Sequence, residues 1–181
     1  MDIEHLDGDG ARARFSEIEA VYAEAFPGYD LGDYRARMAG LLARSGFDVV
    51  TARRDGVLAG FAYGTPLPIG SHWWDGLKPS ASEAFTAETG ERTFAVIDLA
   101  VRPSHRGSGL GRRLLDDLLT ARPEERATLA TAPHEHEVQA MYRRWGWRHV
   151  GRTPGGEGET EPWFDLYVMA LRAAPEDNSS R

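Results

Sequence analysis

A glycine-rich loop at residues 106–111, set between an apolar run and a leucine stripe, constrains this chain more than any other feature. The apolar run over residues 94–100 is short, partly β-branched and followed by Pro103, which predicts a buried strand. Beyond the loop, five leucines fall on one helical stripe: Leu110, Leu114, Leu115, Leu118 and Leu119. The stretch therefore predicts a strand, a tight loop and an amphipathic helix in succession.

The loop reads Arg-Gly-Ser-Gly-Leu-Gly from Arg106 to Gly111, and it predicts a binding site for an anion. Glycine has no Cβ, so its backbone can adopt positive φ and approach a ligand closely. A helix that begins here presents N–H groups and the positive end of its dipole, which suit a pyrophosphate. Arg106 and Arg112 add positive charge at the rim. Two common phosphate motifs do not fit, because Arg112 replaces the third glycine of G-x-G-x-x-G and no Gly-Lys pair completes a P-loop.

The remaining pattern, R-x-x-G-x-G between a strand and a helix, resembles the acyl-CoA signature of the GCN5-related N-acetyltransferase (GNAT) superfamily. The wider form V-R-P-x-x-R-G-x-G-L-G-x-x-L-L fits from Val101 to Leu115. A second stretch, residues 140–147, is similar to the A-x-Y-x-x-x-G-F pattern of the same family, with Trp147 in place of the phenylalanine. The resemblance covers roughly residues 15–171, and its two specific motifs lie in the family's order.

The resemblance implies an α/β protein with the GNAT fold, in which a mixed, twisted central sheet of about six to seven strands has helices on both faces. We expect one domain over residues 1–172 and a loose tail at 173–181. Apolar periodicity predicts helices at residues 15–26, 31–44, 110–121 and 136–145, and we expect a further short helix at 80–89, where no clear period supports it. The periodicity also guides the strand assignments. It predicts strands at residues 47–52, 57–63, 94–100, 127–132, 147–152 and 163–171, with a hairpin turn at Asp55-Gly56 and an edge strand or a loose end at residues 1–10.

Composition excludes several classes of protein. The net charge of −7 weighs against nucleic acid as a partner, and no apolar run reaches the length that spans a membrane. The sequence has no cysteine, which excludes disulfides and a cysteine nucleophile, and its acidic start lacks a signal-peptide core. We therefore expect a cytoplasmic protein without a membrane partner, in which a homodimer is possible because family members often pair through their C-terminal strands.

The resemblance also implies how acetyl-CoA, or CoA as product, would be held. The backbone N–H groups of Gly107, Gly109 and Gly111, with Arg106 and Arg112, would bind the pyrophosphate arm. The complete set of cofactor-binding residues that we expect is Leu99, Ala100, Val101, Arg106, Gly107, Ser108, Gly109, Leu110, Gly111 and Arg112.

Acetyl transfer to an amine needs help at three points. The family stabilises the developing negative charge with a backbone N–H of the central strand, here near Leu99 to Val101. By resemblance, Tyr142 would donate a proton to the departing thiolate; the alternative is an interior tyrosine with a satisfied hydroxyl. Asp98 is the best candidate to assist removal of a proton from the ammonium, because a buried carboxylate has a raised pKa. Strand alternation leaves a second interpretation open, in which Asp98 points away from the cleft as a structural acceptor.

Residues 64–91 have no clear period and are rich in proline and glycine, so we expect them to be functional, as a possible lid over the acceptor. His72, Trp73 and Trp74 would form an aromatic wall that suits a cation or a flat ring. Acidic residues of the last loop and strand, Glu157, Glu159, Glu161 and Asp165, also favour a cationic amine. The alternative is that the tryptophans belong to the core and the acids to a solvated loop. We predict no metal, because the His-Glu-His-Glu run from His134 lacks the H-E-x-x-H spacing.

The sequence therefore predicts an N-acetyltransferase that moves an acetyl group from acetyl-CoA directly to a primary amine on a small cationic or aromatic molecule. Two alternatives remain. One is acetylation of a protein N-terminus or lysine side chain, and the other is an acyl-CoA-binding sensor without turnover.

Overall fold

The computed structural model describes residues 1–156, 159 and 161–172, and the chain divides into two compact units. The first unit combines Met1–Pro66 with Phe94–Arg122, and the second combines Leu67–Thr93 with the chain from Pro123. The expectation of one domain over residues 1–172 stays a prediction, and the expected tail at 173–181 lies outside the described residues. No helix in the described part of the chain is long and apolar enough to cross a membrane.

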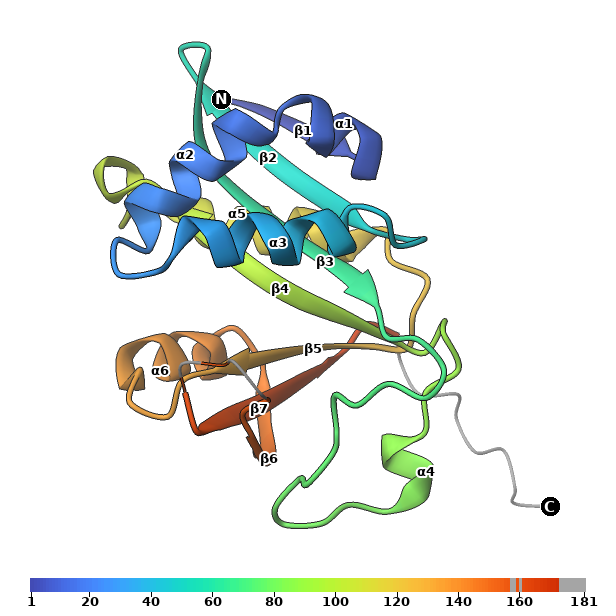
Figure 1. The fold of residues 1–181 in the computed structure, drawn as a ribbon. Helices are drawn as coiled ribbons and strands as arrows, with labels where there is room; N and C mark the ends of the chain where they lie inside the picture. Colours follow the sequence, from blue (N-terminus) through green and yellow to red (C-terminus); the bar gives the residue numbers. More distant parts are fainter. Residues whose placement is uncertain (157–158, 160, 173–181) are drawn as a thin grey trace, which may run out of the picture. The chain divides into compact units, whose positions relative to one another are not determined.

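The first unit contains four antiparallel strands in the order β1-β2-β3-β4 (Figure 1). These strands are β1 (Asp2–Leu6), β2 (Asp48–Arg54), β3 (Val57–Pro66) and β4 (Thr93–Val101). Its helices are α1 (Gly8–Ala13), α2 (Phe15–Ala25), α3 (Leu31–Leu41) and α5 (Leu110–Thr120), and a 3-10 turn η1 spans Pro103–His105.

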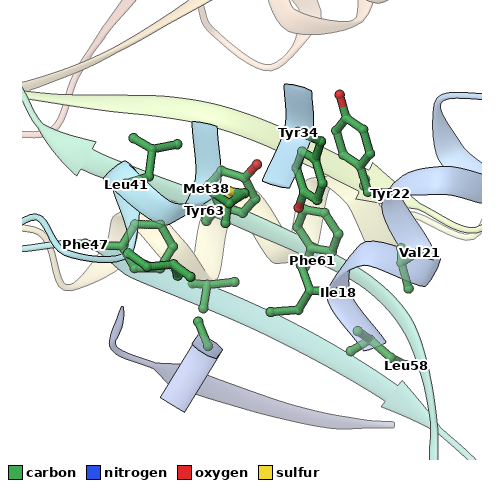
Figure 2. Close-up of a cluster of buried hydrophobic side chains, with 14 residues drawn as sticks. Ile18, Val21, Tyr22, Tyr34, Met38, Leu41, Phe47, Leu58, Phe61 and Tyr63 are labelled. Carbon is green, nitrogen blue, oxygen red and sulfur yellow. The ribbon is translucent and has the colours of Figure 1, made fainter. Parts of the chain in front are cut away.

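Helices cover both faces of this four-stranded sheet. Phe61 and Tyr63 of β3 belong to the buried cluster that α2 and α3 form with the sheet (Figure 2). Gly60 faces the other way, because a Cβ at that position would lie 3.1 Å from Leu114 Cδ1 of α5. Successive residues of β3 therefore face α2 and α3 on one side of the sheet and α5 on the other. This agrees with the predicted fold class, which has helices on both faces.

A bulge interrupts the pairing of β3 with β4 at the centre of the first unit. Tyr63 is opposite Asp98 and Gly64 is opposite Val96, which leaves Ile97 as the extra residue of β4. A bulge turns neighbouring side chains toward one face. Ile97 accordingly packs against the buried cluster of α2 and α3, and Asp98 lies on the same face as Tyr63.

The second unit contains three antiparallel strands in the order β5-β7-β6. Its elements are α4 (Glu83–Thr86), β5 (Arg126–Thr131), α6 (His136–Arg144), β6 (Arg148–Pro154) and β7 (Trp163–Ala170). A second bulge makes Val150 the extra residue of β6, since His149 pairs with Tyr167 and Gly151 with Leu166. With seven strands and helices among the described residues, the α/β fold class of six to seven strands is confirmed.

The predicted elements differ from the observed ones mainly at their ends. Residues 2–6 form a paired strand rather than a loose end, and the short helix α1 that follows was not expected. The helix predicted at 80–89 shrinks to the four residues of α4, and the one predicted at 31–44 ends at Leu41. Terminal turns are the least determined by periodicity, because few core contacts fix them.

Candidate functional site

The glycine loop adopts the left-handed backbone that its sequence predicts. Gly107 has φ of 76°, and Gly109, the N-cap of α5, has φ of 79°. A Cβ at either position would meet no atom within 4 Å. The glycines are therefore required by their φ angles and not by crowding, and the space in front of the loop is open.

The loop and the first turn of α5 present backbone donors. No backbone acceptor in the described chain takes the N–H groups of Gly107, Gly109 or Gly111. The Ser108 side chain is occupied, because its Oγ donates a hydrogen bond of 2.8 Å to the His105 carbonyl. Since α5 is eleven residues long, its dipole adds positive potential at the same end. An open cradle of N–H donors fits the phosphate arm of a nucleotide-containing cofactor.

The two arginines expected at the rim have local partners. Arg106 donates from Nε to the Val101 carbonyl at 3.2 Å and from Nη2 to the Ala25 carbonyl at 3.1 Å, so it braces the loop against the end of α2. Arg112 Nε lies 3.0 Å from Asp116 Oδ2, one turn along α5. Both side chains remain exposed, so they add charge near the loop while the backbone N–H groups supply the aimed donors.

The backbone direction at the end of β4 can be read from one hydrogen bond. Arg102 N donates to the Ala59 carbonyl at 2.9 Å, which points this N–H toward β3. Because N–H directions alternate along an antiparallel strand, the N–H groups of Leu99 and Val101 point away from β3. N–H groups in this direction could donate to the negative charge that develops during acetyl transfer. That role of the segment from Leu99 to Val101 stays a prediction.

Asp98 sits in a cluster of tyrosines with one arginine. Tyr63 Oη donates a hydrogen bond to Asp98 Oδ2, and Arg37 Nη1 donates to the same oxygen at 3.1 Å. The Arg37 guanidinium lies 5.5 Å from the centroid of the Tyr34 ring. Tyr34 stacks on Tyr22 (Figure 2), and the two ring centroids are 3.7 Å apart. Asp98 Oδ1 has no hydrogen-bond partner within the described chain, and the side chain keeps 16% of its surface exposed.

The cluster shifts the pKa of each of its members. Burial raises the pKa of Asp98 above its usual range, although the Arg37 charge and the Tyr63 hydrogen bond act to lower it. Burial and the Asp98 charge raise the pKa of Tyr22 to about 12 and that of Tyr63 well above its usual value. Burial acts to lower the pKa of Arg37, but the Asp98 charge, the neighbouring Tyr63 and Tyr22 and the hydrogen bond to Asp98 together outweigh it and raise that pKa, so Arg37 stays cationic. The site therefore holds one carboxyl group with a raised pKa and a free oxygen, which is the chemistry of a general base.

Tyr142 lies in the middle of α6 in the second unit. Its side chain is 8% exposed, and its ring contacts Trp145 and Trp147 edge-on, at centroid distances of 5.8 and 6.0 Å. The aromatic packing fixes the orientation of the ring. Such a fixed phenol fits both interpretations of the sequence analysis, proton donor and interior tyrosine.

The three residues expected to form an aromatic wall have different environments. Trp74 is 4% exposed, packs edge-on against Phe85 and donates from Nε1 to Glu88 at 2.8 Å, so it belongs to the core. Trp73 is half-buried and donates from Nε1 to Thr128 Oγ1 at 3.1 Å. His72 is exposed beside Asp75. Contact with substrate therefore stays a prediction for His72 and Trp73, and the structure favours the core interpretation for Trp74.

The acidic residues do not form one acidic edge. Asp165 is buried beneath Arg152 and His149, and Glu161 lies 3.8 Å from His134. Glu157 lies outside the described residues. No group of three or more His, Asp or Glu side chains in the described part could hold a metal ion, the run at 134–137 included.

Sequence reasoning missed Arg37 and Tyr63, the two residues that hold Asp98. A signal for each exists in the sequence. Arg37 lies three residues after Tyr34 and four before Leu41, so it falls beside the buried stripe of α3. Tyr63 alternates with Phe61 on the same face of β3. Neither signal names Asp98 as the partner, since both contacts join residues far apart in the chain.

The bulged strand β4, the left-handed glycine loop and the helix α5, which begins at that loop, together form an arrangement typical of anion-binding α/β proteins. The profile of the acetyltransferase (GNAT) family matches residues 14–147, so the chain belongs to that family. The GNAT resemblance of the two motifs is thereby confirmed. No curated protein sequence matches the chain at a significant level.

Solved structures of acetyltransferases share the fold across almost the whole chain. Aminoglycoside 6'-acetyltransferase type Ii is 17% identical with a TM-score of 0.68, covering 97% of this chain and 100% of its own. The ribosomal-protein-S18-alanine N-acetyltransferase from Escherichia coli is 14% identical with a TM-score of 0.67, covering 97% of each chain. The putative acetyltransferase yncA from Salmonella typhimurium, solved with its cofactor acetyl-CoA, is 19% identical with a TM-score of 0.60, covering 98% of each chain. At these identities, the likeness shows the fold alone.

Proposed function

We propose that this acetyltransferase moves an acetyl group from acetyl-CoA to a primary amine on a small cationic or aromatic molecule, without a covalent enzyme intermediate. The observation that carries the proposal is the pairing, within one unit, of the open glycine loop with a partly buried carboxyl group whose Oδ1 has no hydrogen-bond partner among the described residues. The loop accounts for cofactor binding, and Asp98 accounts for activation of the amine.

Acetyl-CoA would supply the acetyl group as an activated thioester. The N–H groups of Gly107, Gly109 and Gly111 would hold its pyrophosphate arm, because no backbone acceptor in the described chain takes them. Arg106 contributes charge and fixes the loop through the Val101 and Ala25 carbonyls.

Asp98 removes a proton from the incoming ammonium. Its Oδ2 is held by Tyr63 and Arg37, so Oδ1 is the atom that accepts the proton, directly or through water. The raised pKa of Asp98 lies closer to the pH at which an enzyme works than the pKa of an exposed aspartate does. Asp98 therefore accepts a proton more effectively than an exposed aspartate would.

Two further groups act on charge and protons during transfer. Backbone N–H groups of Leu99 and Val101, which point away from β3, donate hydrogen bonds where negative charge develops on the carbonyl oxygen. The Tyr142 hydroxyl donates a proton to the departing sulfur, and its ring is held for this by Trp145 and Trp147.

The acceptor class rests on the carboxylate of Asp98, which suits a cationic amine. Tyr22 and Tyr34 are 4% and 1% exposed, so their stacked rings support Arg37 and do not contact the acceptor. Among proteins of similar fold, one is an aminoglycoside 6'-acetyltransferase and another is a ribosomal-protein-S18-alanine N-acetyltransferase, so both small-molecule and protein acceptors occur. Acetylation of a protein N-terminus is therefore the second candidate.

Thermal melting followed by an acceptor screen tests the proposal. A ligand that binds only the native state raises the melting midpoint, so acetyl-CoA is expected to raise it where NADH and ATP do not. Release of free thiol is then measured with an aminoglycoside, a polyamine, an aromatic monoamine, an alanine-initiated peptide and a lysine peptide. Turnover with a small amine supports the proposal, and turnover with a peptide alone supports the second candidate. Binding of acetyl-CoA with no turnover indicates the sensor alternative, and no shift with acetyl-CoA contradicts the cofactor assignment.

A further inference from the structure

A cavity of about 500 Å³ lies in the second unit, apart from the residues assigned to acetyl transfer. Its lining residues are Lys78, His149, Arg152, Trp163 and Asp165. They come from the segment before α4, from β6 and from β7, so three separate stretches of chain converge on it. The bulge at Val150 brings His149 onto the face of β6 that carries Arg152, since both side chains reach Asp165.

The segment that carries Lys78 is fixed to β6. Lys78 N donates to the Arg152 carbonyl and Arg152 N donates to the Lys78 carbonyl, each at 2.8 Å. Two glycines permit this close approach: a Cβ on Gly151 would lie 2.7 Å from the Lys78 carbonyl oxygen, and one on Gly76 would lie 2.9 Å from Pro154. Lys78 is therefore held at the cavity by its backbone.

This pairing sets two cations side by side. Residues that exchange both backbone hydrogen bonds in an antiparallel pair direct their side chains to the same face, with Cα atoms about 5.5 Å apart. Like charges directly opposite one another are destabilising in such a pair. Lys78 and Arg152 are in this position, which an anion between them would relieve.

Asp165 cannot serve as that anion for Lys78, because its oxygens are already engaged. Arg152 donates to both of them, at 3.0 and 3.1 Å. His149 Nε2 lies 3.0 Å from Oδ1, and Gln139 Nε2 donates to Oδ2 at 3.1 Å. Burial acts to raise the pKa of Asp165, but the bonds from Arg152 and His149 outweigh it and hold that pKa below its usual range. The Asp165 carboxylate is thus the counter-ion of Arg152, and the Asp165 side chain is only 6% exposed.

Lys78 is left as the uncompensated charge of the cavity. Its ammonium forms no ion pair with any described residue, and it lies 5.7 Å from the centroid of the Trp163 ring. The half-buried indole gives the cavity an apolar wall next to this charge. A cation would meet Lys78, Arg152 and a carboxylate with no free oxygen, so the cavity selects against it.

We propose that this cavity is a binding site for a small organic carboxylate, whose charge pairs with Lys78 beside Arg152 and whose apolar or aromatic body lies on Trp163. The inference concerns the second unit alone and does not depend on acetyl transfer. Its failure would therefore leave the proposed function untouched, and the reverse holds as well.

Lys78 is the one lysine of the sequence, which allows a site-specific test on the unmodified protein. The protein is labelled with an amine-reactive ester, and the rate of modification at Lys78 is followed by peptide mass spectrometry, with the N-terminal amine as internal reference. Benzoate is expected to slow labelling of Lys78 at least several-fold, while the reference stays unchanged. Benzylamine, which has the same ring and the opposite charge, is expected to give no protection. Equal protection by both probes, or none by benzoate, overturns the proposal.

Calorimetric titration of variants separates the two parts of the site. Lys78→Gln is expected to weaken benzoate binding about tenfold, as loss of a hydrogen bond to a charged group implies. Arg54→Gln, which removes one positive charge at the hairpin of the first unit, is the matched control and is expected to bind benzoate normally. Trp163→Leu is expected to weaken benzoate but not acetate. Unchanged benzoate affinity in Lys78→Gln overturns the proposal, and tighter binding of inorganic phosphate than of benzoate overturns the choice of a carboxylate.

Discussion

Replacement of Gly109 by alanine tests the geometry on which the cofactor site depends. Gly109 is the N-cap of α5 with φ of 79° and ψ of 1°, and a Cβ there would meet nothing within 4 Å. The substitution therefore adds no clash, and its whole cost is conformational. Left-handed backbone costs a residue with a Cβ roughly 1–2 kcal/mol.

That cost must be visible in one of two measurements. If the loop keeps its conformation in Gly109→Ala, the unfolding free energy falls by the full amount, and the melting midpoint drops by about 2–8 °C, at roughly 2–4 °C per kcal/mol for a chain of this size. If the loop relaxes instead, the N–H donors are displaced. The dissociation constant of acetyl-CoA then rises by up to about 5- to 30-fold, which is the same free energy in binding.

Gly40→Ala is the matched control, because it makes the same chemical change in the same unit. Gly40 is exposed in α3, has no positive φ, and a Cβ there would meet nothing within 4 Å. Alanine in a helix is favoured over glycine by up to about 1 kcal/mol, so the midpoint is expected to rise. Melting is followed by circular dichroism and affinity by calorimetry. The reasoning is refuted if Gly109→Ala changes neither quantity, or if both variants lower the midpoint equally.

Three further predictions concern the first unit. Asp98→Asn is expected to lower kcat at least about 100-fold while the melting shift with acetyl-CoA persists, as loss of a general base implies; normal turnover in stopped assays would exclude the role. Because burial raises the pKa of Asp98, kcat/KM is expected to fall on acidification at a pH above the usual aspartate range. Tyr63 lowers that pKa, so Tyr63→Phe should move the acid limb of the pH profile to higher pH, and a move to lower pH would contradict the assignment. Gly60→Ala would place a Cβ 2.8 Å from the Ala100 carbonyl oxygen and 3.1 Å from Leu114 Cδ1, so urea unfolding should show a loss of about 1–3 kcal/mol; stability equal to that of the wild type would contradict the packing of α5 on β3.

The glycine loop could be predicted from the sequence because its determinants are local. A strand, a positive-φ turn and a helix each leave a signal within a few residues, and the three signals lie side by side between residues 94 and 119. The same holds for α2, whose apolar spacing predicts bounds within one residue of those observed. The helix α1 could not be predicted and the bounds of α4 were predicted too wide, since a four- to six-residue helix has too few turns to show a period.

The surroundings of Asp98 could not be predicted, because they depend on contacts between distant residues. Arg37 and Asp98 are 61 positions apart, and Tyr63 and Asp98 are 35 positions apart. The bulge at Ile97 decides which face the carboxyl group occupies, and a bulge leaves no mark in the alternation of an apolar strand. The sequence therefore identified Asp98 as a candidate but could not choose between base and structural acceptor.

The residues near Asp165 show why the number of charged residues in a segment does not predict whether a site prefers a cation or an anion. Four acidic residues between positions 157 and 165 favoured a cationic ligand at that edge. The potential in a cavity depends instead on the charges that remain after local pairing. Arg152 neutralises Asp165 through two hydrogen bonds, and the backbone pair between Arg152 and Lys78 adds a second cation with no carboxylate of its own. Among the described acidic side chains of this segment only Asp165 lines the cavity, and it is paired, so the proposal of an anionic ligand rests on Lys78.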